Sequence, residues 1–316
     1  MVPWTQLAAE TRAPTRLALH RDPGPDRLAR WIAVLGPEPD ACLVCSASAP
    51  LQLFFRDGKW FWICRECELV WVHDIYPEFI QAIEYLDDRE RYRPREKPNQ
   101  REQREFAGLL SAFERRRDLG TLLEVGTGPG LFLAAAASAG WRAIGVEILP
   151  ELAAMVREER GLDVRTGDLF DAAFAQSSFD VAYLNEVIEH IVDPVALLGE
   201  VRRVLRPGGI AVLRTGNARS WSARLRGAHW PYLHFGGHDH IRYWSPRAMA
   251  ALARATGMEL DSARTHGFAF CERDELRDAW YRPLVKLSQA CVSPLAGPFG
   301  AGHRLTVTLR RPREIT

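Results

Sequence analysis

A glycine-rich break between two apolar runs constrains the fold of this chain more than any other feature. Residues 121–125 form a short apolar run, which is typical of a buried parallel strand. Gly126, Gly128 and Gly130 follow, and an alanine-rich run at 131–138 then predicts a helix. Strand, glycine loop and helix open a nucleotide-binding βαβ unit, because glycines let a ligand approach bare backbone. The sequence therefore predicts an α/β fold.

The acid at position 124 indicates the charge of the ligand. The loop reads G-x-G-x-G with Pro129 inside it, which differs from the dinucleotide fingerprint G-x-G-x-x-G, and it lacks the Lys-Ser/Thr pair of a P-loop. Glu124 stands just before the first glycine. A carboxylate at this place is unfavourable for a phosphate and favourable for a cation. We therefore expect a positively charged ligand.

At these residues the chain resembles the class I S-adenosylmethionine (SAM)-dependent methyltransferases. Residues 124–130 are similar to the first motif of that family, which cradles the methionine end of SAM. The resemblance covers about residues 119–311. It implies a Rossmann-like seven-stranded sheet with an antiparallel last strand and helices on both faces. It also implies SAM as the cofactor.

The resemblance assigns further SAM contacts to the ends of later strands. Glu147, at the end of the apolar run 141–147, would accept hydrogen bonds from both ribose hydroxyls, as acids do in dinucleotide-binding folds. Asp168 would bind the adenine amine, and Leu169 would offer a backbone N–H; from the residues alone, Asp168 also fits a helix N-cap. The expected cofactor-binding residues are Glu124, Gly126, Thr127, Gly128, Gly130, Glu147, Ile148, Asp168, Leu169 and Asn185.

Two C-x-x-C pairs near the N-terminus predict a structural zinc site. Cys42 and Cys45 are separated by eighteen residues from Cys64 and Cys67, a spacing typical of four-cysteine zinc sites. The apolar runs 51–55 and 60–63 between the pairs predict a hairpin, and hence a zinc ribbon. We interpret the ribbon as a structural staple or as a wall over the substrate, and similar modules of nucleotide-sugar C-methyltransferases support the second interpretation.

Histidines after the expected fourth strand (179–184) and fifth strand (210–215) are candidate catalytic residues. Residues 185–194 lack the Asn-Pro-Pro-Tyr motif of enzymes that methylate exocyclic amines, and the Glu-His pair at 189–190 resembles ubiquinone-biosynthesis-type and sugar methyltransferases. Residues 238–245 resemble the acceptor segment of nucleotide-sugar C-methyltransferases. We expect His240, oriented by Asp239, to be the base, with His190 as the alternate, because the pKa of histidine suits proton transfer at neutral pH.

Other interpretations of the histidines and of the whole chain remain open at this stage. A metal site formed by His234, His238 and His240 is one alternative, since their spacings allow the three side chains to converge. A zinc-ribbon ribosomal RNA methyltransferase and a non-catalytic SAM-binding protein are alternatives for the whole chain. The net charge of +1 gives no electrostatic argument for nucleic acid, which we do not expect as a partner.

Changes in composition and proline- or glycine-rich linkers divide the 316 residues into segments. We expect an N-terminal extension (1–40), the zinc ribbon (41–74), a charged helical connector (75–118) and the methyltransferase domain (119–316), with an acceptor loop at 219–245 and an insertion at 267–302. No run reaches the ~20 apolar residues of a membrane span. The two C-x-x-C pairs fit metal binding in a reducing compartment better than disulfides, so we expect a cytoplasmic protein. The expected reaction is base-assisted methyl transfer to O or C of a small-molecule acceptor, such as a specialised metabolite or a sugar-type substrate. Assembly of the chain into a homodimer is a further possibility that the sequence leaves open.

Overall fold

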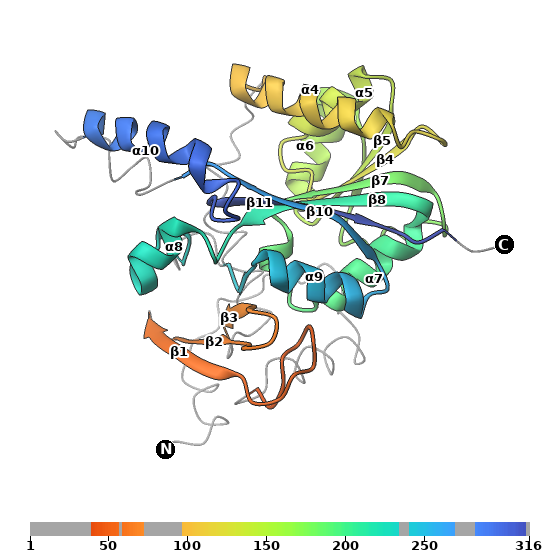
Figure 1. Cartoon of the computed structure of the whole chain (residues 1–316). Helices are drawn as coiled ribbons and strands as arrows, with labels where there is room; N and C mark the ends of the chain where they lie inside the picture. Colours follow the sequence, from red (N-terminus) through yellow and green to blue (C-terminus); the bar gives the residue numbers. More distant parts are fainter. Residues whose placement is uncertain (1–38, 57–58, 73–96, 234–239, 269–281, 314–316) are drawn as a thin grey trace, which may run out of the picture.

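The computed structural model describes residues 39–56, 59–72, 97–233, 240–268 and 282–313 (Figure 1). Its main feature is a seven-stranded sheet in the order β10-β11-β8-β7-β4-β5-β6. Its strands are β4 (Thr121–Val125), β5 (Arg142–Glu147), β6 (Asp163–Thr166), β7 (Phe179–Asn185), β8 (Leu205–Gly216), β10 (Glu259–His266) and β11 (Arg304–Arg310). β11 runs antiparallel to both β8 and β10, whereas β6, β5, β4, β7 and β8 are parallel. The expected Rossmann-like sheet with an antiparallel last strand is confirmed.

Helices cover both faces of this sheet, as expected (Figure 1). One side carries α4 (Gln100–Glu114), α5 (Leu131–Ser138) and α6 (Pro150–Arg160), and the other carries α7 (Pro194–Val204) and α9 (Pro246–Ala255). Phe113, Phe132 and Trp141 are buried on the first side, whereas Val201 and Leu252 are buried on the second. The central parallel strands are covered on both faces, and all five residues of β4 and the first six residues of β7 are buried.

Helix starts follow their capping residues. Ser245 accepts the backbone N–H of Ala248, and Pro246 occupies the first turn, so α9 begins with a sequence typical of a helix start. α4 begins at Gln100, within the segment expected as a charged helical connector, because Asn99 and Glu102 form a capping box there.

A second sheet joins the cysteine-containing segment to the acceptor segment. Its order is β1-β2-β3-β9, with β1 (Leu51–Arg56), β2 (Lys59–Ile63), β3 (Val70–Val72) and β9 (Arg242–Tyr243). The expected hairpin is present as β1 and β2. β3 pairs antiparallel with β9: Val70 lies opposite Tyr243, and Trp71 lies opposite Arg242, far along the chain. The segments expected as a separate ribbon and an acceptor loop therefore share one sheet.

The remaining elements lie between the fifth strand and the end of the chain. α8 (Trp221–Arg226) follows β8, and α10 (Arg282–Ala296) lies within the 267–302 insertion. The apolar pattern at 276–287 predicts an amphipathic helix, and this stretch begins outside the described residues. Residues 1–38 and 73–96 also lie outside them, as do Asp239, His234 and His238. Within the described ranges, no helix is both long and apolar enough to cross a bilayer.

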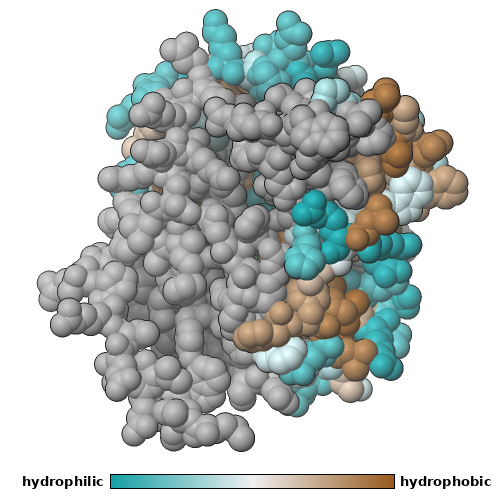
Figure 2. Space-filling model, turned by 90° about the vertical axis from the view of Figure 1, so that its left-hand side faces the viewer, coloured by the Kyte–Doolittle hydropathy of each residue, from teal (hydrophilic) through white to brown (hydrophobic). Residues whose placement is uncertain are grey.

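Part of the small sheet presents apolar side chains to the surface. Leu51, Leu53, Phe55 and Trp60 of the β1–β2 hairpin are all more than a third exposed. Figure 2, which views the molecule from the side that carries β1 in Figure 1, shows apolar groups gathered in places on this side. The hairpin therefore has one face packed on the protein and one face exposed.

Candidate active site

The glycine loop is tightly packed against neighbouring segments. Gly126 has φ +72°, and a Cβ atom there would lie 2.6 Å from Cγ2 of Val187. The amides of Gly126 and Thr127 donate to the carbonyl oxygen of Val146 at 2.8 and 3.3 Å. The loop is thereby held at the carboxyl ends of β4 and β5, which is where ligands bind in open α/β sheets.

Glu124 is a buried carboxylate with unmet hydrogen-bonding capacity. Its side chain is 4% exposed, and Oε2 has no hydrogen-bond partner among the described residues. Burial, followed by the negative charge of Glu147, raises the pKa of Glu124 well above its usual range, and the amide of Leu133 offsets part of this effect. A cationic ligand beside Glu124 would stabilise its ionised form.

The Glu147 carboxylate is held at the end of β5 by two backbone amides. Oε2 accepts from Gly128 at 2.9 Å and Oε1 accepts from Leu149 at 3.1 Å. A carboxylate oxygen can accept more than one hydrogen bond, so a carboxylate at this place can also accept a hydroxyl hydrogen. The next residue, Ile148, is 49% exposed and offers an apolar surface beside the carboxylate.

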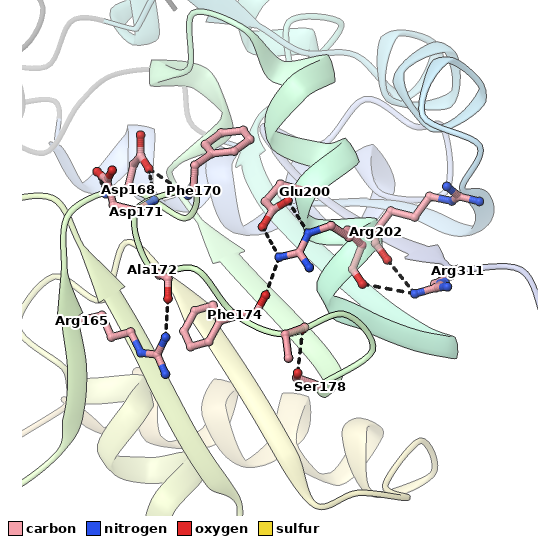
Figure 3. Close-up of polar contacts among 12 residues, drawn as sticks. Arg165, Asp168, Phe170, Asp171, Ala172, Phe174, Ser178, Glu200, Arg202 and Arg311 are labelled. Carbon is pink, nitrogen blue, oxygen red and sulfur yellow. Dashed lines mark hydrogen bonds and ion pairs between the residues drawn. The ribbon is translucent and has the colours of Figure 1, made fainter. Parts of the chain in front are cut away.

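Asp168 organises the turn after β6. Its Oδ1 accepts the backbone N–H groups of Phe170 and Asp171, both at 2.8 Å (Figure 3). This is a capping role of the kind that the sequence allows, although it caps a turn rather than a regular helix. The side chain of Leu169 is buried, whereas Phe170 is 39% exposed. The assignment of Asp168 and Leu169 to adenine stays a prediction.

The two other expected cofactor residues lie at the carboxyl ends of neighbouring strands. Asn185 is the last residue of β7. Thr127 is buried in the glycine loop, and its hydroxyl oxygen has no hydrogen-bond partner within the described part of the chain. The expected cofactor residues on β4, β5, β6 and β7 therefore follow adjacent strands of one sheet.

A cluster of carboxylates, histidines and a tyrosine lies just after β7. Glu189 is fully buried, and its Oε1 accepts the Tyr232 hydroxyl at 2.6 Å. The Tyr232 ring stacks on the imidazole of His240 with centroids 4.1 Å apart, and the His190 and His240 centroids are 4.8 Å apart. We call Glu186, Glu189, His190, Tyr232 and His240 the acceptor cluster.

The close packing of Tyr232 depends on Gly216. A Cβ atom at Gly216 would lie 2.4 Å from the Tyr232 ring, and the Gly216 amide donates to the tyrosine hydroxyl at 2.9 Å. The end of β8 therefore fixes the position of this ring.

Glu186 adds a carboxylate with an altered pKa to the cluster. Burial, followed by the charge of Glu189, raises the pKa of Glu186 to about 7, although the ion pair with Arg304 opposes this rise. Glu186 also has φ +53°, a backbone conformation that is uncommon for residues other than glycine. At neutral pH this carboxylate can therefore exchange a proton.

The structure brings two of the three expected catalytic residues together. His190 and His240 are neighbours, whereas Asp239 lies outside the described residues. The Nδ1 atom of His240 lies 3.1 Å from the carbonyl oxygen of Tyr232. Sequence reasoning did not select Glu186, Tyr232 or Arg304. The sequence offers one indication of this cluster, which is the close spacing of two acids, Glu186 and Glu189, in the segment that follows β7.

The four cysteines form a compact cluster. Sγ of Cys42 lies 3.6 Å from Sγ of Cys67, and Sγ of Cys45 lies 3.5 Å from Sγ of Cys64; all four sulfurs lie within 4.8 Å of one another. A tetrahedral ion with Zn–S bonds of about 2.3 Å requires sulfurs about 3.8 Å apart. The four residues therefore fit a zinc ion.

The cysteine cluster is joined to the acceptor cluster through β9. The amide of Val72 donates to the carbonyl of Ile241 at 3.0 Å, and the Ile241 amide donates to the carbonyl of Glu189 at 2.9 Å. The buried Arg242 guanidinium donates to the carbonyls of Val72 and Val192 at 3.2 and 3.1 Å. The small sheet and the segment after β7 are thereby tied together beside His240.

Comparison with known proteins agrees with this architecture. The sequence profile of the family described as "Methyltransferase domain" matches residues 98–263, which is more than half of the chain. This chain belongs to the methyltransferase domain family. The match, together with the sheet order, confirms the class I SAM-dependent methyltransferase fold that the first glycine motif implies.

Relatives of this methyltransferase are known in sequence and in structure. The ubiquinone biosynthesis O-methyltransferase of Cereibacter sphaeroides is 34% identical over 147 residues, which are 44% of this chain and 60% of that protein. The SAM-dependent methyltransferase from Mesorhizobium loti has a TM-score of 0.43 at 19% identity, covering 64% of this chain and 96% of that one. The geranyl diphosphate C-methyltransferase from Streptomyces coelicolor has a TM-score of 0.43 at 17% identity, covering 65% and 79%.

Proposed function

We propose that this methyltransferase transfers the methyl group of SAM to a hydroxyl oxygen of a small-molecule acceptor. The observation that carries the proposal is the position of Glu124: a buried carboxylate, with one oxygen unpartnered among the described residues, lies directly before the glycine loop. The similarity to O-methyltransferases of ubiquinone biosynthesis supports oxygen as the methylated atom. A specialised metabolite or a sugar-type compound remains our proposal for the acceptor class.

The expected cofactor residues would bind SAM by complementary charge and hydrogen bonding. Bound SAM supplies an activated methyl group. Glu124 would lie beside the cationic methionine end, and the Glu147 carboxylate, which the amides of Gly128 and Leu149 hold in place, would accept the ribose hydroxyls. Asp168 and Ile148 contact the adenine, and the glycine loop gives close backbone approach.

The acceptor cluster would orient the hydroxyl and take its proton. As the new O–CH₃ bond forms, the S–CH₃ bond breaks and its electron pair stays on sulfur, which leaves S-adenosylhomocysteine. The hydroxyl proton goes to His240 or to its neighbour His190. Val187 packs against Gly126, so the segment that carries Glu186 and Glu189 directly adjoins the cofactor loop. This contact fixes the acceptor relative to the methyl group.

The cysteine cluster would hold a structural zinc ion. Cys42, Cys64 and Cys67 are buried in the same apolar cluster as Trp244, which donates its indole N–H to the carbonyl of Ile188. Zinc would stabilise this small module, which is too short to fold on its own apolar core.

The proposal is tested by turnover with matched histidine variants. The zinc-loaded protein is incubated with methyl-labelled SAM and a panel of phenols, vicinal diols and sugars, and S-adenosylhomocysteine and methylated product are quantified together. We expect product with at least one hydroxylated acceptor. His240→Gln is expected to lower kcat about 100-fold or more, whereas the exposed His229→Gln should have no effect.

Two results would contradict the proposed function. Product formation that is unchanged in both His240→Gln and His190→Gln would refute the proposed role of the acceptor cluster. Tight SAM binding without turnover on any member of the panel would contradict the proposed reaction.

A further inference from the structure

We propose that Glu189, His190 and His240 form a binding site for a divalent transition-metal ion, separate from the cysteine cluster. One donor atom from each residue lies within 4.8 Å of the other two. The three residues come from two segments, the turn after β7 and the residue two positions before β9. The hydrogen bond from the Ile241 amide to the Glu189 carbonyl holds these segments together.

Glu189 is the strongest indication of a missing cation. Its side chain is 0% exposed, yet Oε2 has no hydrogen-bond partner within the residues that the structure describes. The other oxygen accepts the hydroxyl of Tyr232, a neutral donor, at 2.6 Å. A fully buried carboxylate is costly unless it is paired with a cation or fully hydrogen-bonded. A metal ion on Oε2 would supply this charge.

The charges around the site also favour a cation. Glu186 Oε2 lies 3.3 Å from the Tyr232 hydroxyl, so a second carboxylate adjoins the first. Arg304 forms an ion pair with Glu186 rather than with Glu189. Because Arg304 is paired with Glu186, an ion on Glu189 would balance the charge of the second carboxylate.

The donor set indicates which metals the site would bind. Two imidazoles and one carboxylate suit Mn²⁺, Fe²⁺, Co²⁺ or Zn²⁺, whereas a site for Mg²⁺ or Ca²⁺ usually offers only oxygen atoms. Four thiolates instead select zinc. The two sites of this chain would therefore differ in metal preference, and Mn²⁺ would enter the acceptor cluster without displacing zinc from the cysteines.

The catalytic consequence of the metal site rests on the proposed methyl transfer, but metal binding itself does not. Three protein ligands leave coordination positions open, and an acceptor hydroxyl in one of them would lose its proton more readily. In the metal-bound protein this would replace the base role proposed above: His190 and His240 would be metal ligands, and the proton would go to Glu186 of the same cluster.

The test measures Mn²⁺ binding without turnover. Zinc-loaded protein is titrated with Mn²⁺, and free Mn²⁺ is followed by electron paramagnetic resonance. We expect one Mn²⁺ per chain, with an affinity that falls about 10-fold or more in Glu189→Gln and in His240→Asn. The exposed His229→Asn should bind as the unmodified protein does. S-adenosylhomocysteine binding by each variant shows that it remains folded.

The outcomes separate the metal site from the proposed reaction. No Mn²⁺ binding, or binding unchanged in folded Glu189→Gln and His240→Asn, overturns the metal site. If Glu189→Gln fails to fold, the double variant His190→Asn/His240→Asn gives the decision, because both imidazoles are partly exposed. Mn²⁺ binding with no methyl transfer would leave the metal site standing and would count only against the proposed function.

Discussion

At the scale of single residues, Glu124 links stability to cofactor binding. Because its pKa is raised by burial and by Glu147, the folded apoprotein retains a proton that the unfolded chain has already released. Its contribution to stability is therefore complete below the unfolded pKa of about 4.3 and is lost as the pH rises through the folded pKa. A cationic ligand reverses this balance, because it favours the ionised carboxylate.

Replacing Glu124 by Gln should separate these two effects. We expect SAM affinity to fall about 10-fold, which corresponds to about 1.4 kcal/mol, because the charge that faces the cation is lost. The apoprotein variant should gain stability at the upper end of the pH range. Calorimetric titration measures the SAM affinity, and thermal unfolding of the apoprotein measures its stability, each across the neutral pH range. In the unmodified protein, SAM affinity should weaken as the pH falls; a variant with unchanged affinity at every pH would contradict the role of Glu124.

Two glycine positions give a matched pair of predictions on packing. Gly216→Ala places a methyl group 2.4 Å from the Tyr232 ring and should destabilise the protein by about 1–3 kcal/mol while displacing that ring from Glu189. Gly199→Ala, in α7, meets nothing within 4 Å and should stabilise the protein by about 0.5–1 kcal/mol. Urea unfolding measures the free energy of unfolding of both variants. Equal changes in the two variants would contradict the close packing of Tyr232 on Gly216.

At the scale of elements, buried Asp180 ties β7 to the start of β4. Its carboxylate accepts the amides of Leu119, Gly120 and Thr121 at 3.1, 2.7 and 3.2 Å, and it pairs with Arg206. Burial raises the pKa of Asp180, but the hydrogen bonds from Arg206 and the backbone amides outweigh it, so the pKa lies below its usual value.

Asp180→Asn should therefore destabilise the fold by about 2–4 kcal/mol at neutral pH, because Arg206 loses its buried partner. Since the folded pKa is depressed, this stabilisation is present above the unfolded pKa of about 3.9 and is lost as the pH falls through the folded value. Unfolding free energies of the variant and of the unmodified protein should thus converge in acid. A constant difference at all pH values would contradict this account.

The elements that the sequence predicts are those with strong local patterns. The buried strands β4 and β7, the hairpin of β1 and β2, and the Ser245 cap carry such signals in consecutive residues. β9 has only two residues, and its pairing with β3 depends on contacts between distant segments. The acceptor cluster was missed in part for the same reason, because Glu186 and Tyr232 meet only after the sheet has formed.

At the scale of the whole molecule, the cysteine segment supports the acceptor site through β9. Chelation of zinc should release the hydrogen bonds that Val72 and Arg242 make across this junction. We expect zinc-free protein to lose most turnover and to gain an early thermal transition, whereas S-adenosylhomocysteine affinity should change less than about 3-fold, because the glycine loop lies on other strands. If zinc-free protein lost S-adenosylhomocysteine binding together with turnover, the zinc module would not act on the acceptor site alone.

Calorimetric titration of the zinc-loaded protein with SAM and S-adenosylhomocysteine tests the cofactor site directly. We expect micromolar binding of one molecule per chain, weakened about 100-fold in Glu147→Ala and unchanged in Glu158→Ala, whose exposed side chain lies on α6. Absence of binding to the unmodified protein, or equal binding by Glu147→Ala, would contradict the assignment of the glycine loop and β5 to SAM.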